Sequence, residues 1–421
     1  MKVKNIDWKV KQKYIKQIIG AILFILAISY ASEEFIPGRL QLQKKIFIVV
    51  ALLGILGWVY KNINRVKNKY WMVLVWFCIP FVLTSFYTIL ICSINGDQIG
   101  TAGQAITTSM FLVVDFFVSI ALIIFFDKSV IKVMTFSVLG AYAYIILFKI
   151  QKVGVGSAVR QLLGKELERN DIGVAVVPLI LYYLYIFLVK KNKNKSNLFF
   201  TGLLFVVMVL CAKRSAILSL AVGIVMILMT KYTNKNATTL LKIISVLTIV
   251  FSFLYVVGIH VGAFDQVLAG KGTLSDRLYV WKYFDGMYEI SPLYFGKGFS
   301  FVHRYMTAGL GDWMVNHYEY LHNSILQLYI ETGFWGFLIW TGNYFILIPH
   351  IAMKKYGKNA CNFTIISIVS MFAMFTVDNN LTYPLYQICL YCSLYSLYRS
   401  EELEQRQEMR DKNGYTFGNS N

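Results

Sequence analysis

Long apolar runs separated by short polar stretches set the pattern of the whole chain. A helix of about 20 apolar residues crosses the hydrocarbon core of a bilayer, and helices satisfy their own backbone hydrogen bonds there. We therefore expect an all-α polytopic membrane protein with about twelve transmembrane helices. The expected spans lie near residues 17–32, 46–60, 70–94, 105–126, 130–150, 172–189, 198–212, 215–230, 240–260, 325–350, 363–377 and 385–398.

The second, seventh, eighth and twelfth spans are short, so we expect them to extend into their flanks or to form a re-entrant pair. We expect residues 1–421 to form a single integral membrane domain that ends in a polar cytoplasmic tail, 399–421. Two polar segments interrupt the apolar pattern. The smaller is an outer loop at 152–171, and the larger, at 261–321, contains many Tyr and Trp residues. Loops of this length are usually functional or disordered, and the aromatic content argues against disorder. Short amphipathic helices on the membrane are expected in the larger loop, for instance at 276–287.

The charge pattern orients these segments. The chain carries a net charge of +19 with 57% hydrophobic residues, and the positive-inside rule explains this excess better than nucleic-acid binding. With the N-terminus inside, 26 Lys and Arg residues fall on cytoplasmic segments and 15 on outer ones. We therefore expect a multi-pass membrane protein with both termini cytoplasmic, the 261–321 loop outside, membrane lipids as surroundings and no nucleic-acid partner.

Arginines on the outer side are candidates for binding an anion, because a guanidinium group presents a planar fork to phosphate oxygens. Arg214 lies at the junction of two spans, and Arg277 begins a helical stretch in the large loop. Arg169 and Arg160 come from the smaller loop. A membrane-interface anchor is the alternative for Arg214, and a solvated surface position is the default for Arg160 and Arg304.

His322 is the strongest candidate for a general base, since imidazole titrates near neutral pH. It lies where the large loop enters an apolar stretch, and the neighbouring Asn323 suits sugar hydroxyls. The alternative is a structural histidine that only forms hydrogen bonds. Gly333 and Gly336 are expected to permit close helix packing. Glu331 is out of phase with His322 on a helix and should not pair with it.

The remaining polar positions are less informative. Asp115 lies within an expected span, where a charged residue is a functional candidate, and a hydrogen bond to a neighbouring Ser or Tyr is the alternative. Asp378 lies on a short outer turn without an assigned role. The sequence has no Asp-x-Asp pair, P-loop, HExxH motif or cysteine metal set, so we expect neither a metal nor another cofactor.

The run from His322-Asn323 through nine residues to Gly333-Phe-Trp-Gly336 resembles the motif of the O-antigen ligase and O-antigen polymerase superfamily, membrane glycosyltransferases of the GT-C type. Arg277-x-x-x-Trp281 and Pro292-Leu-Tyr-Phe-Gly296-Lys-Gly298 resemble the start of the large outer loop of that family. Lys213-Arg214-Ser215 resembles its Ser-Arg turn, with Lys213 where Ser or Thr is usual. The specific resemblance covers about residues 200–345, and the flanks agree in helix number and topology.

The resemblance implies an oligosaccharide on undecaprenyl pyrophosphate as substrate. It also implies that the reaction occurs at the outer leaflet of a bacterial cytoplasmic membrane, with inversion at the anomeric carbon. It implies that His322 activates the acceptor hydroxyl and that Arg214 and Arg277 hold the pyrophosphate. Arg169, Asn323 and Trp281 are further predicted substrate-binding residues. A flippase and a chain-length regulator are the protein partners that this pathway suggests.

The motif does not separate a polymerase from a ligase. Lys outnumbers Arg 31 to 10 and Asn is plentiful, which suggests an AT-rich genome of the kind common in single-membrane bacteria that lack lipid A core. We therefore favour a polymerase of capsule or exopolysaccharide repeat units over a ligase that transfers polymer to lipid A core or protein. A flippase or transporter is a further alternative, although it would more often show internal repeats and charges in several helices.

Overall fold

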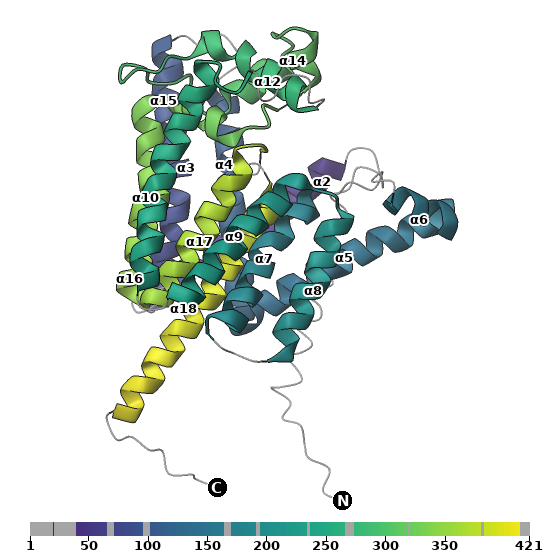
Figure 1. The fold of residues 1–421 in the computed structure, drawn as a ribbon, viewed down its shortest axis with the longest axis vertical. Helices are drawn as coiled ribbons and strands as arrows, with labels where there is room; N and C mark the ends of the chain where they lie inside the picture. Colours follow the sequence, from purple (N-terminus) through teal and green to yellow (C-terminus); the bar gives the residue numbers. More distant parts are fainter. Residues whose placement is uncertain are drawn as a thin grey trace, which may run out of the picture. The chain divides into compact units, whose positions relative to one another are not determined.

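Every regular element is a helix in the described part of this computed structural model (Figure 1), which confirms the all-α prediction for that part. The structure describes residues 20, 39–64, 71–95, 102–163, 170–190, 194–233, 236–265, 273–318, 320–379 and 383–412.

The predicted membrane spans are confirmed in part. Among the residues that the structure describes, six helices are long and apolar enough to cross a membrane, and two further apolar helices, at Phe47–Tyr60 and Lys195–Leu210, are shorter. This finding is consistent with a helical membrane protein, and the expected total of about twelve spans stays a prediction. The expected span at 17–32 lies outside the described residues, apart from residue 20. The six long helices are Val73–Ile94, Asp171–Leu188, Arg214–Thr233, Ala237–His260, Ser324–Tyr356 and Lys358–Phe375.

Two of the short spans extend into their flanks, as expected. The second corresponds to α2 (Arg39–Asn64), and the twelfth to α18 (Pro384–Lys412), which continues through the polar residues after Tyr398. The chain divides into two compact units. The first contains Met1–Lys67, Val114–Ala216 and Leu385–Ser396, and the second contains Asn68–Val113, Ile217–Pro384 and Leu397–Asn421.

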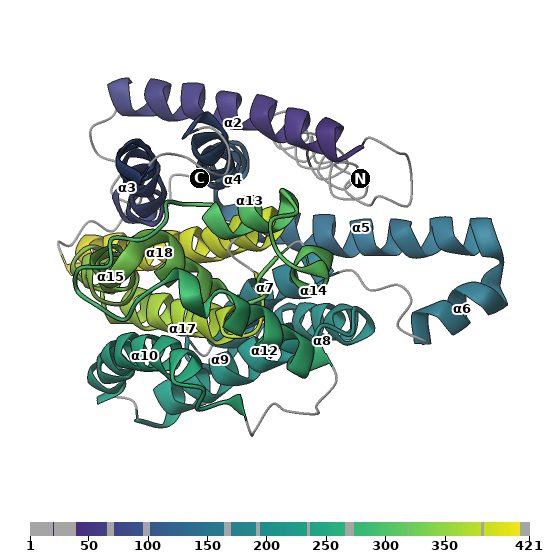
Figure 2. The same ribbon diagram turned by 90° about the horizontal axis from the view of Figure 1, so that it is seen from above.

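In the first unit, α7 (Asn170–Leu188) packs closely against α8 (Lys195–Leu210). The contact is tight because Gly173 has no side chain: a Cβ atom there would lie 2.8 Å from Cβ of Cys211. α5 (Val130–Val153) also packs on α7, and Thr135 and Tyr183 share a hydrogen bond of 3.0 Å between them. α5 ends at Val153, with Gly154 as its C-cap, and is followed by α6 (Val155–Leu163), which Figure 2 shows at the end of α5.

The second unit is a bundle in which small polar side chains join neighbouring helices, a common device in membrane proteins. Ser219 of α9 and Ser370 of α17 share a hydrogen bond of 2.8 Å, and the Ser245 hydroxyl of α10 donates to the Phe345 carbonyl at 2.7 Å. The main helices are α3 (Trp71–Asn95), most of α9 (Arg214–Thr233), α10 (Ala237–His260), α15 (Ser324–Gly342), a π-helical turn (Asn343–Leu347), α16 (Ile348–Tyr356) and α17 (Lys358–Phe375).

The large polar segment forms a layer of short helices at one end of this bundle (Figure 1). It contains α12 (Thr273–Tyr283), a 3₁₀ turn (Asp285–Met287), α13 (Phe301–Thr307) and α14 (Trp313–His317). The helix expected at 276–287 is therefore present as α12 and the turn that follows it. That these helices lie on a membrane surface stays a prediction.

Gly333 interrupts α15 with a left-handed backbone (φ 70°, ψ −174°). The chain between Tyr294 and Gly298 lies directly against this break. Backbone amides of Lys297 and Gly298 donate to the carbonyls of Ile330 and Glu331, at 3.0 and 2.9 Å. A Cβ on Gly333 would lie 2.3 Å from the carbonyl carbon of Phe295. Gly333 does permit close packing, but its close contact is with the segment 294–298 rather than with a helix, because the break frees backbone groups of α15 for that segment.

Candidate active site

His322 stands at the entrance to α15 with a backbone that few residues other than glycine adopt. Its φ is 51°, and its side chain is 25% exposed. A left-handed backbone costs on the order of 1–3 kcal/mol and tends to occur where the surrounding structure holds a functional residue in place. His322 does not cap the helix, because Asn323 is the N-cap and its side-chain oxygen accepts from the Leu326 amide at 3.0 Å.

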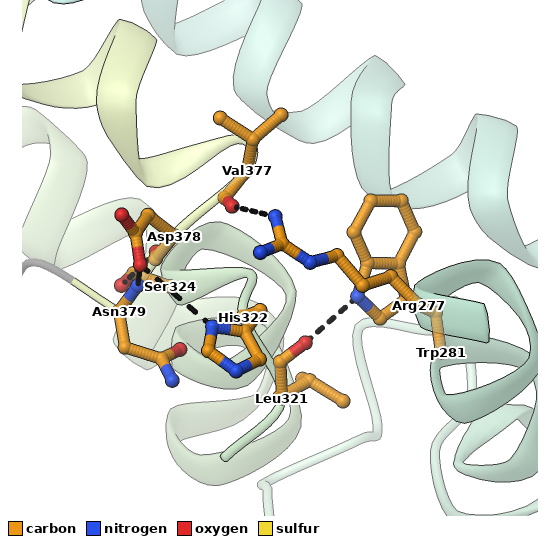
Figure 3. A network of polar contacts seen from close by, with 8 residues as sticks. All are labelled: Arg277, Trp281, Leu321, His322, Ser324, Val377, Asp378 and Asn379. Atoms are coloured by element: carbon orange, nitrogen blue, oxygen red, sulfur yellow. Dashed lines mark hydrogen bonds and ion pairs between the residues drawn. The ribbon is translucent and has the colours of Figure 1, made fainter. Parts of the chain in front are cut away.

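The acidic partner of His322 is Asp378, on the turn that follows α17. Nδ1 of His322 lies 3.7 Å from Oδ1 of Asp378, and the Asp378 side chain is 1% exposed (Figure 3). The turn is fixed to the start of α15, since the Ser324 amide and hydroxyl donate to the Asp378 carbonyl at 3.2 and 2.9 Å. The distance fits an ion pair with a protonated histidine, and catalytic contacts are often this long before substrate binds.

Arg277 of α12 reaches the same turn. Its Nη1 donates to the Val377 carbonyl at 2.8 Å, and Figure 3 shows the guanidinium group directed toward the turn that carries Asp378. A guanidinium group has five N–H donors, so this one bond orients the side chain and leaves donors for a ligand. The structure therefore brings the predicted base and one predicted phosphate ligand to the same short segment, residues 377–378.

Trp281 lies one helical turn after Arg277 and is 2% exposed. Its indole Nε1 donates to the carbonyl of Leu321 at 2.8 Å (Figure 3). Because Leu321 precedes His322, this bond connects α12 to the backbone that presents the candidate base. The contact supports a positioning role, and the substrate-binding role of Trp281 stays a prediction.

Asn323 is also buried, with 0% of its surface exposed. Besides capping α15, its side-chain nitrogen donates to the hydroxyl of Tyr255 at 3.3 Å, and that hydroxyl donates to the Thr376 carbonyl at 2.7 Å. Asn323 thus connects α10, α15 and the turn after α17. These contacts hold the site together, and sugar binding by Asn323 stays a prediction.

Arg214 is the first residue of α9 and is exposed. A helix N-terminus attracts anions through its unpaired amides and its dipole, so this location suits an arginine that binds phosphate. Arg214 belongs to the first compact unit, whereas Arg277 and His322 belong to the second. Its partnership with them stays a prediction. Arg169 lies outside the described residues.

A second polar group lies further along α15. Glu331 is 1% exposed, and its Oε1 accepts from the Val302 amide at 3.2 Å and from Gln327 Nε2 at 3.1 Å. The prediction that Glu331 would not pair with His322 agrees with these contacts. Arg304 is 8% exposed, so the solvated surface position expected for it is wrong. The sequence pattern did not reveal this burial, because Arg304 belongs to the short helix α13 within a polar segment.

Asp115 is buried in α4 (Ala102–Phe126), at 2% exposed. Its backbone carbonyl accepts from the Ser119 hydroxyl at 2.8 Å. Within the residues that the structure describes, no group of three or more His, Cys, Asp or Glu side chains could hold a metal ion. The absence of a metal requirement stays a prediction.

Asp378 is the member of the site that sequence reasoning left without a role. The available signal was a lone carboxylate on an outer turn, and its pairing with His322 depends on how two distant segments meet. Tyr318 was also missed. Its ring lies edge-on to His322, with 6.0 Å between ring centroids and 86° between planes.

Comparison with known families supports the resemblance seen in the motif. Residues 198–341, about a third of the chain, match the family model described as O-antigen ligase. The matched range contains Arg214, Arg277 and His322 and ends within α15. The match confirms the resemblance to the O-antigen ligase and polymerase superfamily and indicates activity of that general type. No curated protein matches the chain.

Proposed function

We propose that this chain is a membrane polymerase that joins undecaprenyl-pyrophosphate-linked oligosaccharide repeats into O-antigen, capsular or exopolysaccharide chains. The observation that carries the proposal is the contact between His322 and Asp378 at 3.7 Å, on the turn that also accepts from Arg277. A base with an acidic partner, next to a phosphate-binding group, suits transfer of a sugar from a pyrophosphate leaving group.

In the proposed reaction His322 takes the proton of an acceptor hydroxyl as that oxygen attacks the anomeric carbon of the donor. The new bond joins oxygen to this carbon, and the bond from the carbon to the pyrophosphate oxygen breaks. The bonding electrons leave with the pyrophosphate, and the proton stays on the imidazole ring. Attack from the side opposite the leaving group inverts the anomeric centre. Asp378 stabilises the imidazolium that forms.

Arg277 stabilises the charge that develops on the leaving pyrophosphate. One of its donors is taken by the Val377 carbonyl, which fixes the guanidinium group before substrate arrives. Preorganised donors of this kind lower a barrier without reorganising during the reaction. Arg214, at the start of α9, is proposed as the second phosphate ligand.

The reaction is proposed to occur on the outer face of a bacterial cytoplasmic membrane, with both chain termini inside. The support is the excess of basic residues on the segments assigned to the cytoplasm. Compartment-sensitive reporters test this placement: one fused after residue 412, one inserted between residues 308 and 312. Reporters on opposite sides are expected, and reporters on the same side would refute the topology.

The direct test is incubation of the purified protein with a purified lipid-linked repeat. A polymerase produces a ladder of longer lipid-linked chains from this one substrate. Transfer solely to an added lipid A core or protein acceptor would identify a ligase, the alternative that the family match equally accommodates. Accumulation of repeats on the inner leaflet of cells that lack the protein would instead identify a flippase.

A further inference from the structure

Four rings form a continuous series from the candidate base to the outer face of α14. His322 lies 6.0 Å from Tyr318, Tyr318 lies 5.8 Å from His317, and His317 lies 5.6 Å from Trp313, measured between ring centroids. The last pair is stacked, with 20° between the planes. We call Tyr318, His317 and Trp313 the aromatic track.

Exposure increases along the track, away from the reaction centre. The His322 side chain is 25% exposed, Tyr318 is half-buried, and His317 is exposed. Trp313 is 77% exposed although it is among the largest apolar side chains of the outer segment. A tryptophan that packs on a histidine while its surface stays open presents a flat, rigid face to a ligand.

Hydrogen-bonding groups border the aromatic track. The Tyr318 hydroxyl donates to Asp276 at 3.3 Å, and the Tyr279 hydroxyl donates to Asp312, which also accepts from the Val315 amide at 2.9 Å. The hydrogen bond from Tyr279, followed by that from the Val315 backbone, lowers the pKa of Asp312. Asp312 is therefore a carboxylate at neutral pH, directly beside Trp313.

Aromatic faces bordered by carboxylates match the chemistry of a saccharide. The C–H face of a sugar ring packs on the electron-rich face of an aromatic ring, and sugar hydroxyls donate to carboxylates. We propose that the aromatic track binds the growing saccharide chain of the lipid-linked donor, beyond the sugar that reacts. The proposal rests on the proposed polymerase function.

Two observations favour the donor chain over a lipid surface. The first is that the track is continuous with His322. The second is that Arg277 is close enough to the Tyr318 hydroxyl for its positive charge to lower the pKa of that hydroxyl, against burial and Asp276, which raise it. The reacting end of the donor, held by Arg277, would therefore lie beside the inner end of the track. Asp312 and Asp276 would repel the phosphates of an anionic lipid surface, although exposed tryptophans do occur at membrane interfaces.

The test compares two lipid-linked donors, one with a single repeat and one with several, using full-length protein in nanodiscs. We expect Trp313→Ala to lower kcat/KM for the long donor by about 3–10-fold, the effect of one aromatic contact, and to affect the single-repeat donor less. Polymer made by this variant should be shorter than wild-type polymer. Trp313→Phe should restore most of the loss. Leu293→Ala is the matched control, because Leu293 is 79% exposed in the same outer segment and lies off the track.

Equal losses with both donors would overturn the proposal, as would no loss with either. The fluorescence of Trp313 is obtained as the difference between wild type and Trp313→Phe. If brominated phospholipid quenches this fluorescence, Trp313 contacts lipid and the proposal is overturned. Failure of the polymerase function itself would appear differently, as an inactive wild type. In that case binding is tested without the reaction, with 5-fluorotryptophan at residue 313. Its fluorine chemical shift should change when the saccharide released from the donor is added, and an unchanged shift would overturn the proposal.

Discussion

The two ends of the segment from His322 to Gly333 share a left-handed backbone and differ in their surroundings. His322 and Gly333 both have a left-handed φ, 51° and 70°. His322 is partly exposed and lies beside the buried carboxylate of Asp378, on the turn that also accepts from Arg277. Gly333 is buried, and backbone hydrogen bonds join the chain around it to the segment 294–298. One motif thus combines a chemical requirement with an architectural one, and the two are separable by experiment.

The largest effect is expected at the chemical end. His322→Ala should lower turnover by about 10²–10⁴-fold, the usual contribution of a general base, and should change substrate affinity less. The measurement is polymerisation of the purified lipid-linked repeat. His322→Gln separates proton transfer from positioning, because glutamine forms hydrogen bonds but does not take a proton near neutral pH. A Gln variant within a few-fold of wild type would leave His322 with a positioning role.

Substitution at Gly333 should lower the stability of the protein instead. Gly333→Ala should destabilise the protein by about 1–3 kcal/mol or more, since alanine is strained at this φ and its Cβ would lie 2.3 Å from the Phe295 carbonyl carbon. Thermal unfolding in detergent measures this loss. Gly342→Ala, on the same helix, is the matched control because a Cβ there meets nothing within 4 Å. If both variants unfold alike, the clamp at Gly333 has no special importance.

Helix positions and single site residues could be predicted from the sequence, whereas the contacts between distant segments could not. Apolar runs predicted the positions of the eleven expected spans that lie within the described residues, and all eleven are helical. Crossing the hydrocarbon core of a bilayer requires such long apolar stretches. The motif pointed to His322, and the large polar segment pointed to Arg277. The pairing with Asp378 depends on the turn after α17 meeting the start of α15, and no periodicity encodes that contact. The burial of Trp281 and Asn323 was missed for the same reason, since each is decided by packing between distant segments.

The planar shape of an arginine side chain can be tested separately from its positive charge. Arg277→Lys should lower activity by about 10-fold or more, because lysine keeps the charge and loses the planar fork that binds the Val377 carbonyl and phosphate together. Arg214→Lys is expected to behave in the same way if Arg214 is the second phosphate ligand. Both are measured at matched membrane abundance. Lysine variants with near wild-type polymer would assign the two arginines to structural roles.

An effect smaller than that of removing the base is expected at its partner, Asp378. Asp378→Asn keeps the shape of the side chain and removes its charge, so the imidazolium formed during the reaction loses its counter-ion. Contacts to a charged group contribute about 1.5–3 kcal/mol, which corresponds to a fall in turnover of about 10–100-fold. The double variant His322→Ala/Asp378→Asn should be no slower than His322→Ala alone. Additive losses would show that Asp378 acts independently of His322.

The smallest expected effect is that of a chelator, and it tests whether the chemical end of the motif is complete as described. Pyrophosphate is a good leaving group, and arginine donors can stabilise the charge that it acquires. Activity of the purified protein should therefore be unchanged by EDTA within the error of the assay. The contrasting result is a loss that Mg²⁺ or Mn²⁺ restores, and it would mean that carboxylates assigned here to His322 or to the aromatic track serve a cation instead. Repeating the chelator assay with Asp378→Asn and Asp276→Asn would identify which carboxylate does so, because the variant that removes a ligand should raise the metal concentration needed for half-maximal activity.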